Sequence, residues 1–429
     1  MVNETSSTMI SCEECGLIVE IPPLRGGTKA RCPRCNHLLC EHPRSPYQTT
    51  ISLSIATLIM LVLSISFPFM SFSAQGVLQE IALLDAVTML KVHENAALAV
   101  VLLLTVIILP ALYLSCVLVL FLLMLGQGLY RQRKNRLKTA HILARLIFFI
   151  KPWIMVDVFL IGILVSLIKI AALADISMGS SFWAFCLYAL LLVKSISSID
   201  RNWLWSQLFE LNKLTTVKPK IELRNISEGV VDCHMCHQLN RVSESQCIRC
   251  SSRLRLVEPL ITIQKSSALL LTAMVFYIPA NMYPIMYTSF LGASEPSTIL
   301  GGVILLWEHG SYPIAIVIFV ASVLIPLAKM IAMSWLLFSI GKKNSHFDSL
   351  RKLKLYRVTE FIGRWSMIDV FVVSVLVALV QLKGLMAIYP GPAAFSFAIV
   401  VIFTMLSAMA FDSKLLWRDR QHLEHSKIK

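Results

Sequence analysis

Two quartets of cysteines are the residues of this sequence whose types and spacing are best suited to chemistry. Each quartet is built from two CxxC pairs: Cys12, Cys15, Cys32 and Cys35 form the first, and Cys233, Cys236, Cys247 and Cys250 form the second. Two thiolates three positions apart on a tight turn bind one ion, and a second such turn closes a tetrahedron around it. The pattern predicts a structural zinc site in each quartet, because four thiolates leave no open coordination position.

Other chemistries use similar cysteine patterns. An iron centre of rubredoxin type has the same four ligands, so the sequence leaves zinc and iron both open. Disulfides are disfavoured by the cytoplasmic placement derived below, and a redox-active CxxC of thioredoxin type does not require two pairs arranged twice. Cys40, Cys116 and Cys186 lie outside the quartets, and we expect them to be free thiols.

The hydrophobic content of the chain indicates an integral membrane protein. Of its 429 residues, 56% are hydrophobic and 15% are charged, and the mean hydropathy is +0.72. One soluble core cannot bury so much apolar surface. Because a bilayer crossing takes about 20 apolar residues, the sequence predicts eight spans, at 50–70, 96–125, 152–170, 176–199, 266–286, 311–328, 365–382 and 384–411.

Basic residues gather in alternate loops between these spans. The loops after the second and sixth spans are rich in Lys and Arg, whereas the opposite loops hold only Lys91 and Lys383. Because Lys and Arg are retained on the cytoplasmic side, both termini and both quartets are predicted to be cytoplasmic. The net charge of +14 follows from basic loops next to an anionic leaflet, so no nucleic-acid partner is predicted.

The sequence contains an internal repeat. The segment Trp153–Phe159, of pattern WxMxDVF, recurs as Trp365–Phe371. Each copy has a quartet and four spans, so both copies enter the membrane in the same direction. We predict an all-α membrane protein of eight transmembrane helices in two parallel four-helix repeats. Its predicted domains are an N-terminal cytoplasmic zinc ribbon (1–49), the first four-helix repeat (50–210), a second zinc ribbon with linker (211–262), the second four-helix repeat (263–417) and a cytoplasmic tail (418–429).

Charged side chains inside the spans are candidates for a functional role, because burying a charge in the membrane is energetically costly and such residues usually face a bundle interior or a wet cavity. Asp157 and Asp369 hold matching positions in the two repeats. Our hypothesis is that Lys329, at the inner end of the sixth span, pairs with Asp369. Tyr113 matches Lys329 in the first repeat and is expected to donate a hydrogen bond to Asp157. Contact between helices is the alternative role for both aspartates.

Further polar residues and prolines would shape the space between helices. Lys169 lies near the outer end of the third span, with Ser166 one turn before it on the same face, and the two would line an outward-opening cavity. Snorkelling of Lys169 to the surface is equally open. Asn281 is expected to hydrogen-bond backbone freed by nearby prolines. Pro110 and Pro326 interrupt long spans and should kink them.

Catalytic machinery is not predicted from this sequence. No nucleophile, base and orienting group occur together, and no glycine-rich phosphate loop is present. We therefore do not expect an enzyme. Energy for any transport would come from a gradient, a partner or the downhill movement of the substrate.

The paired quartets, the duplicated four-span units, the WxMxDVF segment and the run STILGGV at 297–303 together resemble the paraquat-inducible protein A family, which includes LetA. The resemblance covers essentially the whole chain. It implies an inner-membrane protein of Gram-negative bacteria that works with a periplasmic MCE-domain partner in intermembrane lipid trafficking and envelope integrity. It also implies polar residues within the spans at Lys169 and Lys329.

Three functions remain in view. The first is a lipid-transport subunit that passes a membrane lipid through a cavity between kinked helices to the periplasmic partner. The second is a membrane sensor whose quartets detect metal or oxidants. The third is a structural anchor for the partner, in which the intramembrane polar residues are dispensable. Substitutions of the quartet cysteines and of the intramembrane lysines would distinguish these three functions, because each function predicts a different loss of stability or activity.

Overall fold

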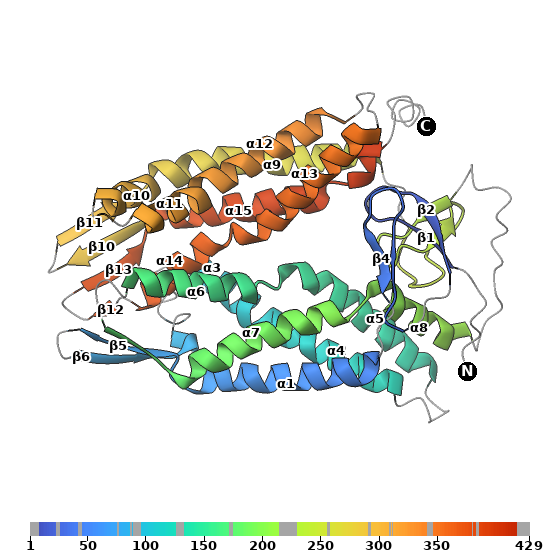
Figure 1. The fold of residues 1–429 in the computed structure, drawn as a ribbon, viewed down its shortest axis with the longest axis horizontal. Coiled ribbons are helices and arrows are strands. Elements are labelled where there is room, and N and C mark those ends of the chain that lie inside the picture. The colour runs from blue at the N-terminus through green and yellow to red at the C-terminus, as the bar shows by residue number, and fades with distance from the viewer. Residues whose placement is uncertain are drawn as a thin grey trace.

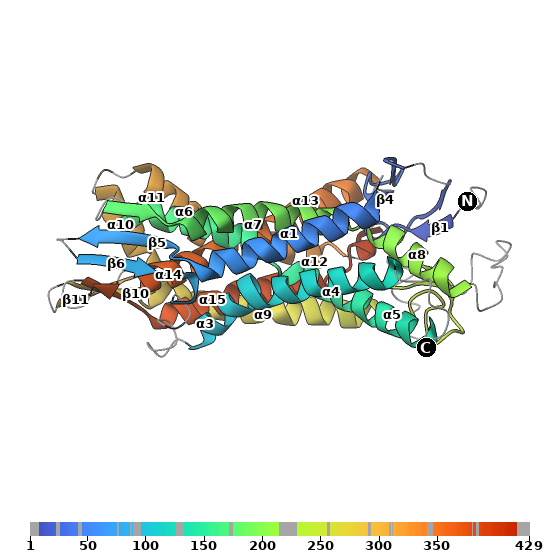
Figure 2. The ribbon, with the colours of Figure 1, turned by 90° about the horizontal axis from the view of Figure 1, so that it is seen from below.

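The computed structural model shows an elongated bundle of antiparallel helices, with small β-sheets at one end and two cysteine-containing modules at the other (Figures 1 and 2). The predicted tail 418–429 lies outside the described residues. The structure describes residues 8–22, 26–41, 45–74, 77–85, 88, 96–125, 133–170, 175–213, 230–254, 258–290, 293–308, 310, 312–340, 346–379, 381–382 and 386–417.

Helices make up most of the described chain, as predicted. The first half, residues 46–213, contains α1 (Pro46–Ser66), α3 (Ala96–Leu103), α4 (Leu109–Leu125), α5 (Arg133–Ile150), α6 (Val156–Ile170), α7 (Ser180–Ser198) and α8 (Arg201–Lys213). The second half, residues 259–417, contains α9 (Pro259–Met282), α10 (Ile299–Glu308), α11 (Tyr312–Phe319), α12 (Ile325–Phe338), α13 (His346–Trp365), α14 (Ile368–Leu379) and α15 (Pro392–Ala410). Two short 3-10 helices, η3 (Lys151–Trp153) and η6 (Ser413–Trp417), complete the halves.

Seven helical segments of the described chain are long and apolar enough to cross a membrane. They are 46–66, 99–125, 137–167, 180–198, 259–282, 315–338 and 392–410. The predicted span at 365–382 contains α14, which has 12 residues and is followed by strand β12 (Gln381–Leu382). Length and composition therefore support seven of the eight predicted spans.

Two small antiparallel sheets lie at the end of the bundle away from the cysteines, and the sequence did not predict them. In the first half, β5 (Met70–Ala74) lies between β6 (Val77–Ile81) and β7 (Asp175–Met178); in the second, the order is β11 (Ala293–Ser297), β10 (Met286–Phe290), β13 (Met386–Pro390) and β12. Each sheet joins the loop after the first long helix of its half to the loop before the last. The sheets therefore tie the loops of each half together.

A glycine stands where each sheet leads into the last long helix. A Cβ atom at Gly179 would lie 2.1 Å from the Pro68 carbonyl oxygen, and one at Gly391 would lie 2.1 Å from that of Pro284. The amide of Gly391 donates to the Ile285 carbonyl at 2.8 Å. Only glycine fits so close an approach of two backbones.

The interruptions predicted at Pro110 and Pro326 take the form of π-helical turns. The π-helix η1 (Leu104–Ile108) precedes Pro110, and η5 (Val320–Leu324) precedes Pro326. Proline lacks an amide hydrogen, so Pro110 leaves the carbonyl of Val106 without its usual partner. The hydroxyl of Tyr188 donates to that carbonyl at 3.3 Å, so a side chain from α7 satisfies the backbone that the proline freed.

The two halves meet within the bundle at the crossing of α6 and α14, which lie side by side in both views (Figures 1 and 2). Gly162 of α6 permits this approach, because a Cβ atom there would be 3.1 Å from the Phe371 Cβ. The rings of Phe159 and Phe371 pack edge to face at 5.3 Å. Ser166, buried in the same crossing, donates to the Val372 carbonyl at 3.4 Å.

The α6–α14 crossing generates a stability prediction. Gly162→Leu should destabilise the protein by about 1–3 kcal/mol, because the added side chain has to displace Phe371 from a packed interface. Thermal unfolding in detergent measures the effect. Gly302→Leu is the matched control, since Gly302 of α10 has no atom within 4 Å of an added Cβ. Equal loss of stability in the two variants would contradict this account of the crossing.

Candidate metal centres and an intramembrane polar site

The two cysteine modules are small pairs of hairpins. The first cysteine module, residues 8–41, contains β1 (Thr8–Ser11) paired with β2 (Ile18–Ile21) and β3 (Lys29–Arg31) paired with β4 (Leu38–Glu41). The second cysteine module, residues 230–254, contains β8 (Val230–Asp232) paired with β9 (Leu239–Arg241). A bridge between Ile10 and Gln238 joins the two modules.

The four CxxC turns share one backbone geometry. In each turn, the amide four residues after the first cysteine donates to the carbonyl of that cysteine. The residues that donate are Gly16, Asn36, His237 and Ser251, and their φ angles are 69°, 58°, 54° and 53°. A left-handed residue at this position turns the chain back so that both thiols of a pair point to the same side.

The sulfur positions fit a tetrahedral metal site in each module. Cys12 and Cys35 have Sγ atoms 3.5 Å apart, and Cys233 and Cys250 also have Sγ atoms 3.5 Å apart. All four sulfurs of each quartet lie within 4.8 Å of one another and are buried. Thiolates about 2.3 Å from a tetrahedral zinc are about 3.8 Å apart, whereas disulfide sulfurs are about 2.05 Å apart. The predicted grouping of the quartets is confirmed.

Each quartet also favours a thiolate before any metal binds. A hydrogen bond from the Cys15 thiol, aided by backbone amides, lowers the pKa of Cys12 to about 5. Hydrogen bonds from Cys236, Cys247 and Cys250 lower the pKa of Cys233. The pKa values of Cys15, Cys35, Cys236 and Cys247 are raised, so the surroundings favour the metal-binding thiolate form at Cys12 and Cys233 and disfavour it at these neighbours.

Each cysteine module contacts the half that does not follow it in the chain as well as the half that does. Arg357 of α13 donates from Nη2 to the Cys35 carbonyl at 2.9 Å, and the Arg34 guanidinium lies 4.1 Å from the Trp417 ring centre. In the first half, Arg145 of α5 donates to the Cys250 carbonyl. Within its own half, the first module bonds to α8 through the Leu39 carbonyl and Asn202, and the second module pairs with Lys414 through Asp232. Both modules therefore bridge the two halves.

Lys329 has the smallest exposed fraction of the charged residues in the described part of the second half. It lies on α12, its residue is 3% exposed, and its Nζ donates to Thr404 Oγ1 of α15 at 3.1 Å. Gly363 of α13 leaves room for it, because a Cβ atom there would be 2.8 Å from Nζ. The hypothesis that Lys329 pairs with Asp369 is wrong: the partner is the hydroxyl of Thr404.

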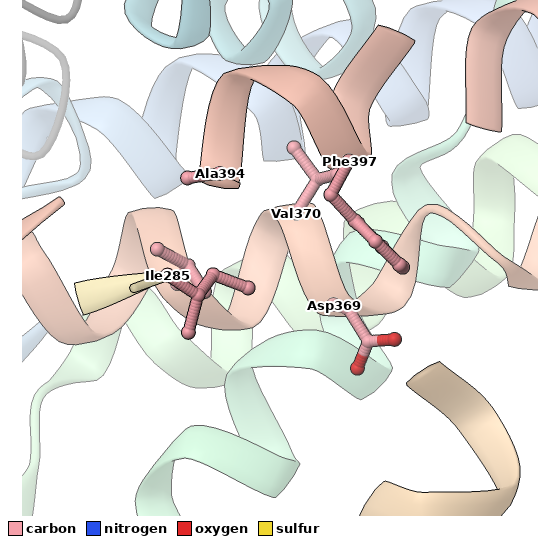
Figure 3. A pocket seen from close by; sticks show the side chains of 6 residues that line it. Ile285, Asp369, Val370, Ala394 and Phe397 are labelled. Atoms are coloured by element: carbon pink, nitrogen blue, oxygen red, sulfur yellow. The ribbon is translucent and has the colours of Figure 1, made fainter. Parts of the chain in front are cut away.

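Asp369 lies in the first turn of α14 and lines a narrow pocket that is too small to hold a water molecule. Figure 3 shows Asp369 and Phe397 at one end of this pocket, Ile285 and Ala394 at the other, and Val370 between them. The remaining lining residue is Val373. Asp369 therefore faces mainly apolar side chains, close to the crossing that joins the halves.

The other predicted residues are spread over both halves. Tyr113 is fully buried, and within the described residues its hydroxyl has no hydrogen-bond partner, so the bond predicted to the half-buried Asp157 is wrong. Ser166 belongs to the α6–α14 crossing rather than to an open cavity. Lys169 lies in α6, and its side chain is outside the described residues. Asn281 does bond to backbone, donating to the Tyr277 carbonyl at 2.9 Å.

Sequence reasoning missed two kinds of residue. Thr404 and Gly363 complete the surroundings of Lys329, but a threonine and a glycine in helical segments carry no signal of their own. Arg145 and Arg357 were read only as loop charges. Their spacing of 212 residues, the same as that between Trp153 and Trp365, would have identified them as matching positions.

Comparison with known proteins places these features in a family. A model of the family described as paraquat-inducible protein A matches residues 47–209 and 263–421. The intermembrane transport protein PqiA of Escherichia coli K12 is 42% identical over 417 residues, covering 97% of both chains. A probable intermembrane transport protein of Haemophilus influenzae is 28% identical, covering 96% of both chains.

A more distant relative has a similar extent. The lipophilic envelope-spanning tunnel protein A of Escherichia coli K12 is 28% identical over 412 residues, covering 95% of this chain and 90% of the relative. No solved structure matches the chain. The sequence relatives therefore extend over both cysteine modules and both halves.

The quartets generate a prediction about metal content. We expect the purified protein to hold two tightly bound metal ions per chain, one for each quartet. Cys12→Ser and Cys233→Ser should each lose one ion, because three thiolates bind far more weakly than four. Elemental analysis by mass spectrometry gives the number and the identity of the ions. Cys116→Ser, which lies outside the quartets, should keep both; loss of metal there, or none in the wild type, would contradict the assignment.

Proposed function

This chain belongs to the paraquat-inducible protein A family, and from this premise we propose that it is the inner-membrane subunit of an intermembrane lipid transport system. In this role it works with a periplasm-spanning MCE-domain partner and supports the integrity of the envelope. The names of the relatives, which describe intermembrane transport, support the membrane transport part of the proposal. The protein is a transporter component and not an enzyme.

The architecture we propose for this role has eight spans in two parallel four-helix repeats. Both halves contain, in the same order, a long helix, a hairpin, a helix with a π-turn before its proline, two further helices, a strand and a last long helix, and the described part of the second half has α10 and β12 in addition. Shared order supports duplication. The cysteine modules are then cytoplasmic zinc ribbons, both termini are cytoplasmic, and the two small sheets face the periplasm, where the partner is.

The observation that carries the proposal is the burial of Lys329. A charged side chain inside a candidate span is costly and marks a substrate or ion path more often than a structural contact. Lys329 has the hydroxyl of Thr404 as its hydrogen-bond partner, and no ion pair to it occurs within the described residues. An ammonium held by a neutral group retains its attraction for an anion.

An anionic lipid headgroup has the chemistry to use this site. A phosphate accepts hydrogen bonds from an ammonium and, in a medium of low polarity, is attracted to it more strongly than in water. Thr404 and the gap at Gly363 keep the ammonium among α12, α13 and α15. A lipid entering between these helices would neutralise Lys329 and leave again when a neighbouring site competes for the headgroup.

The role of Lys329 generates a prediction that separates function from stability. Lys329→Met keeps the length of the side chain and removes the charge, so it should leave the folded protein as abundant as the wild type or more stable. The same variant should fail to restore envelope integrity to cells that depend on this protein. Growth on detergent, with abundance measured by immunoblot, tests both expectations. Lys265→Met, which removes an exposed lysine at the start of α9, is the control.

Two outcomes would overturn the proposal. If Lys329→Met restores envelope integrity fully, the intramembrane charge is dispensable and the protein acts as an anchor for its partner. If Lys329→Met is active but Cys12→Ser remains folded and loses a response to metal or oxidant, the sensor function is favoured. A loss of activity confined to Lys329→Met supports lipid transport.

A further inference from the structure

The two residues inside the first CxxC pair are both glutamates, and both reach out of their module. Glu13 and Glu14 lie between Cys12 and Cys15, whereas the second module has His234 and Met235 at the corresponding positions. A tight turn whose ends are fixed by two metal ligands holds the intervening side chains rigidly. The first quartet therefore sets where the two carboxylates point.

Glu13 connects the first module to the end of the first half. Its Oε1 lies 2.9 Å from Nη1 of Arg201, which begins α8, and 2.5 Å from Nε2 of His237 in the second module. Arg201 Nη1 and His237 Nε2 are themselves 2.7 Å apart. One carboxylate thus joins three segments that are far apart in the sequence.

Glu14 connects the first module to the second half. Nε of Arg357, on α13, lies 3.0 Å from each carboxylate oxygen of Glu14, and Nη2 of the same guanidinium donates to the Cys35 carbonyl at 2.9 Å. His37 supports the pair, with Nδ1 3.1 Å from Glu14 Oε1. The Glu14 side chain is 15% exposed, so this contact is largely shielded from water and stronger than an ordinary surface ion pair.

We propose that the first cysteine module is a metal-dependent clip, in which Glu13 and Glu14 hold the module-bearing ends of the two halves together through Arg201 and Arg357. At the other end the halves are joined by the α6–α14 crossing. The clip therefore limits how far the halves separate at the end where the modules lie, together with the contacts of the second module to Arg145 and Lys414. Loss of metal from the first quartet loosens the turn between Cys12 and Cys15 and releases both carboxylates.

The clip is specific to the first module. The matching cysteine turn of the second module carries no carboxylate between its ligands, and Arg145, which matches Arg357, contacts only backbone there, at the Cys250 carbonyl. The second module has its own ion pair to the second half, between Asp232 and Lys414 of η6, but Asp232 precedes the cysteine turn and does not lie between its two ligands. Metal in the second quartet would therefore not fix the position of a carboxylate as metal in the first quartet does. The two quartets have the same four ligands but differ in the protein segments that their turns connect.

Hydrogen exchange of the full-length protein in nanodiscs tests the clip. In the double variant Glu13→Gln with Glu14→Gln, we expect amides of α8 and of the turns of α13 around Arg357 to exchange roughly tenfold faster, the scale set by the loss of a charge-assisted contact. Glu13→Gln alone should affect α8, and Glu14→Gln alone should affect α13. Removal of metal from the first quartet by Cys12→Ser should reproduce the double variant.

Glu41→Gln is the matched control. Glu41 belongs to the same module but its carboxylate pairs with Lys29, 2.9 Å away within the module. It should leave exchange in α8 and α13 unchanged. Metal content is measured on every variant, and the double variant should keep both ions. The proposal is overturned if the double variant retains wild-type exchange at both helices, if Glu41→Gln has the same effect, or if exchange rises equally in α1 and α9.

Discussion

The ammonium of Lys329 lies inside a helix bundle that faces lipid, so the neighbouring helices of the second half have to provide space and a hydrogen-bond acceptor for it. A glycine on α13 leaves the space, a threonine on α15 supplies the acceptor, and α12 carries the lysine after a π-turn and a proline. In the first half the matching position is Tyr113, fully buried among apolar side chains. The two halves therefore share an order of elements but differ in charge, and the second half is the one equipped to attract an anion.

The crossed packing of the cysteine modules makes the two halves dependent on each other. Each module folds around its own quartet, yet an arginine of the opposite half donates to it, Arg357 to the first module and Arg145 to the second. A change in the separation of the halves would therefore move the modules, and a change in the structure of a module would alter the separation of the halves. The α6–α14 crossing, with Gly162 at its closest approach, provides a fixed point about which such a change can occur.

Much of this structure could be predicted from the sequence, and the failures have physical causes. The quartets could be predicted because metal ligands need a fixed spacing in the sequence. The long apolar helices could be predicted because a membrane crossing needs about 20 apolar residues. The partner of Lys329 could not be predicted, because the sequence does not show which faces of distant helices meet; Thr404 is closer than Asp369. The sheets were missed because their strands are short and adjoin long apolar helices: Met70–Ala74 alternates apolar and polar residues over only five positions, directly after the first long apolar segment.

Transfer of a labelled anionic phospholipid between two vesicle populations, with this protein in one and the periplasmic partner bridging to the other, tests the central claim most directly. The account predicts measurable transfer with the wild-type chain, transfer at the background rate with Lys329→Met, and an unchanged rate with Lys265→Met. Wild-type transfer by Lys329→Met would contradict the claim that the buried ammonium lies on the lipid path.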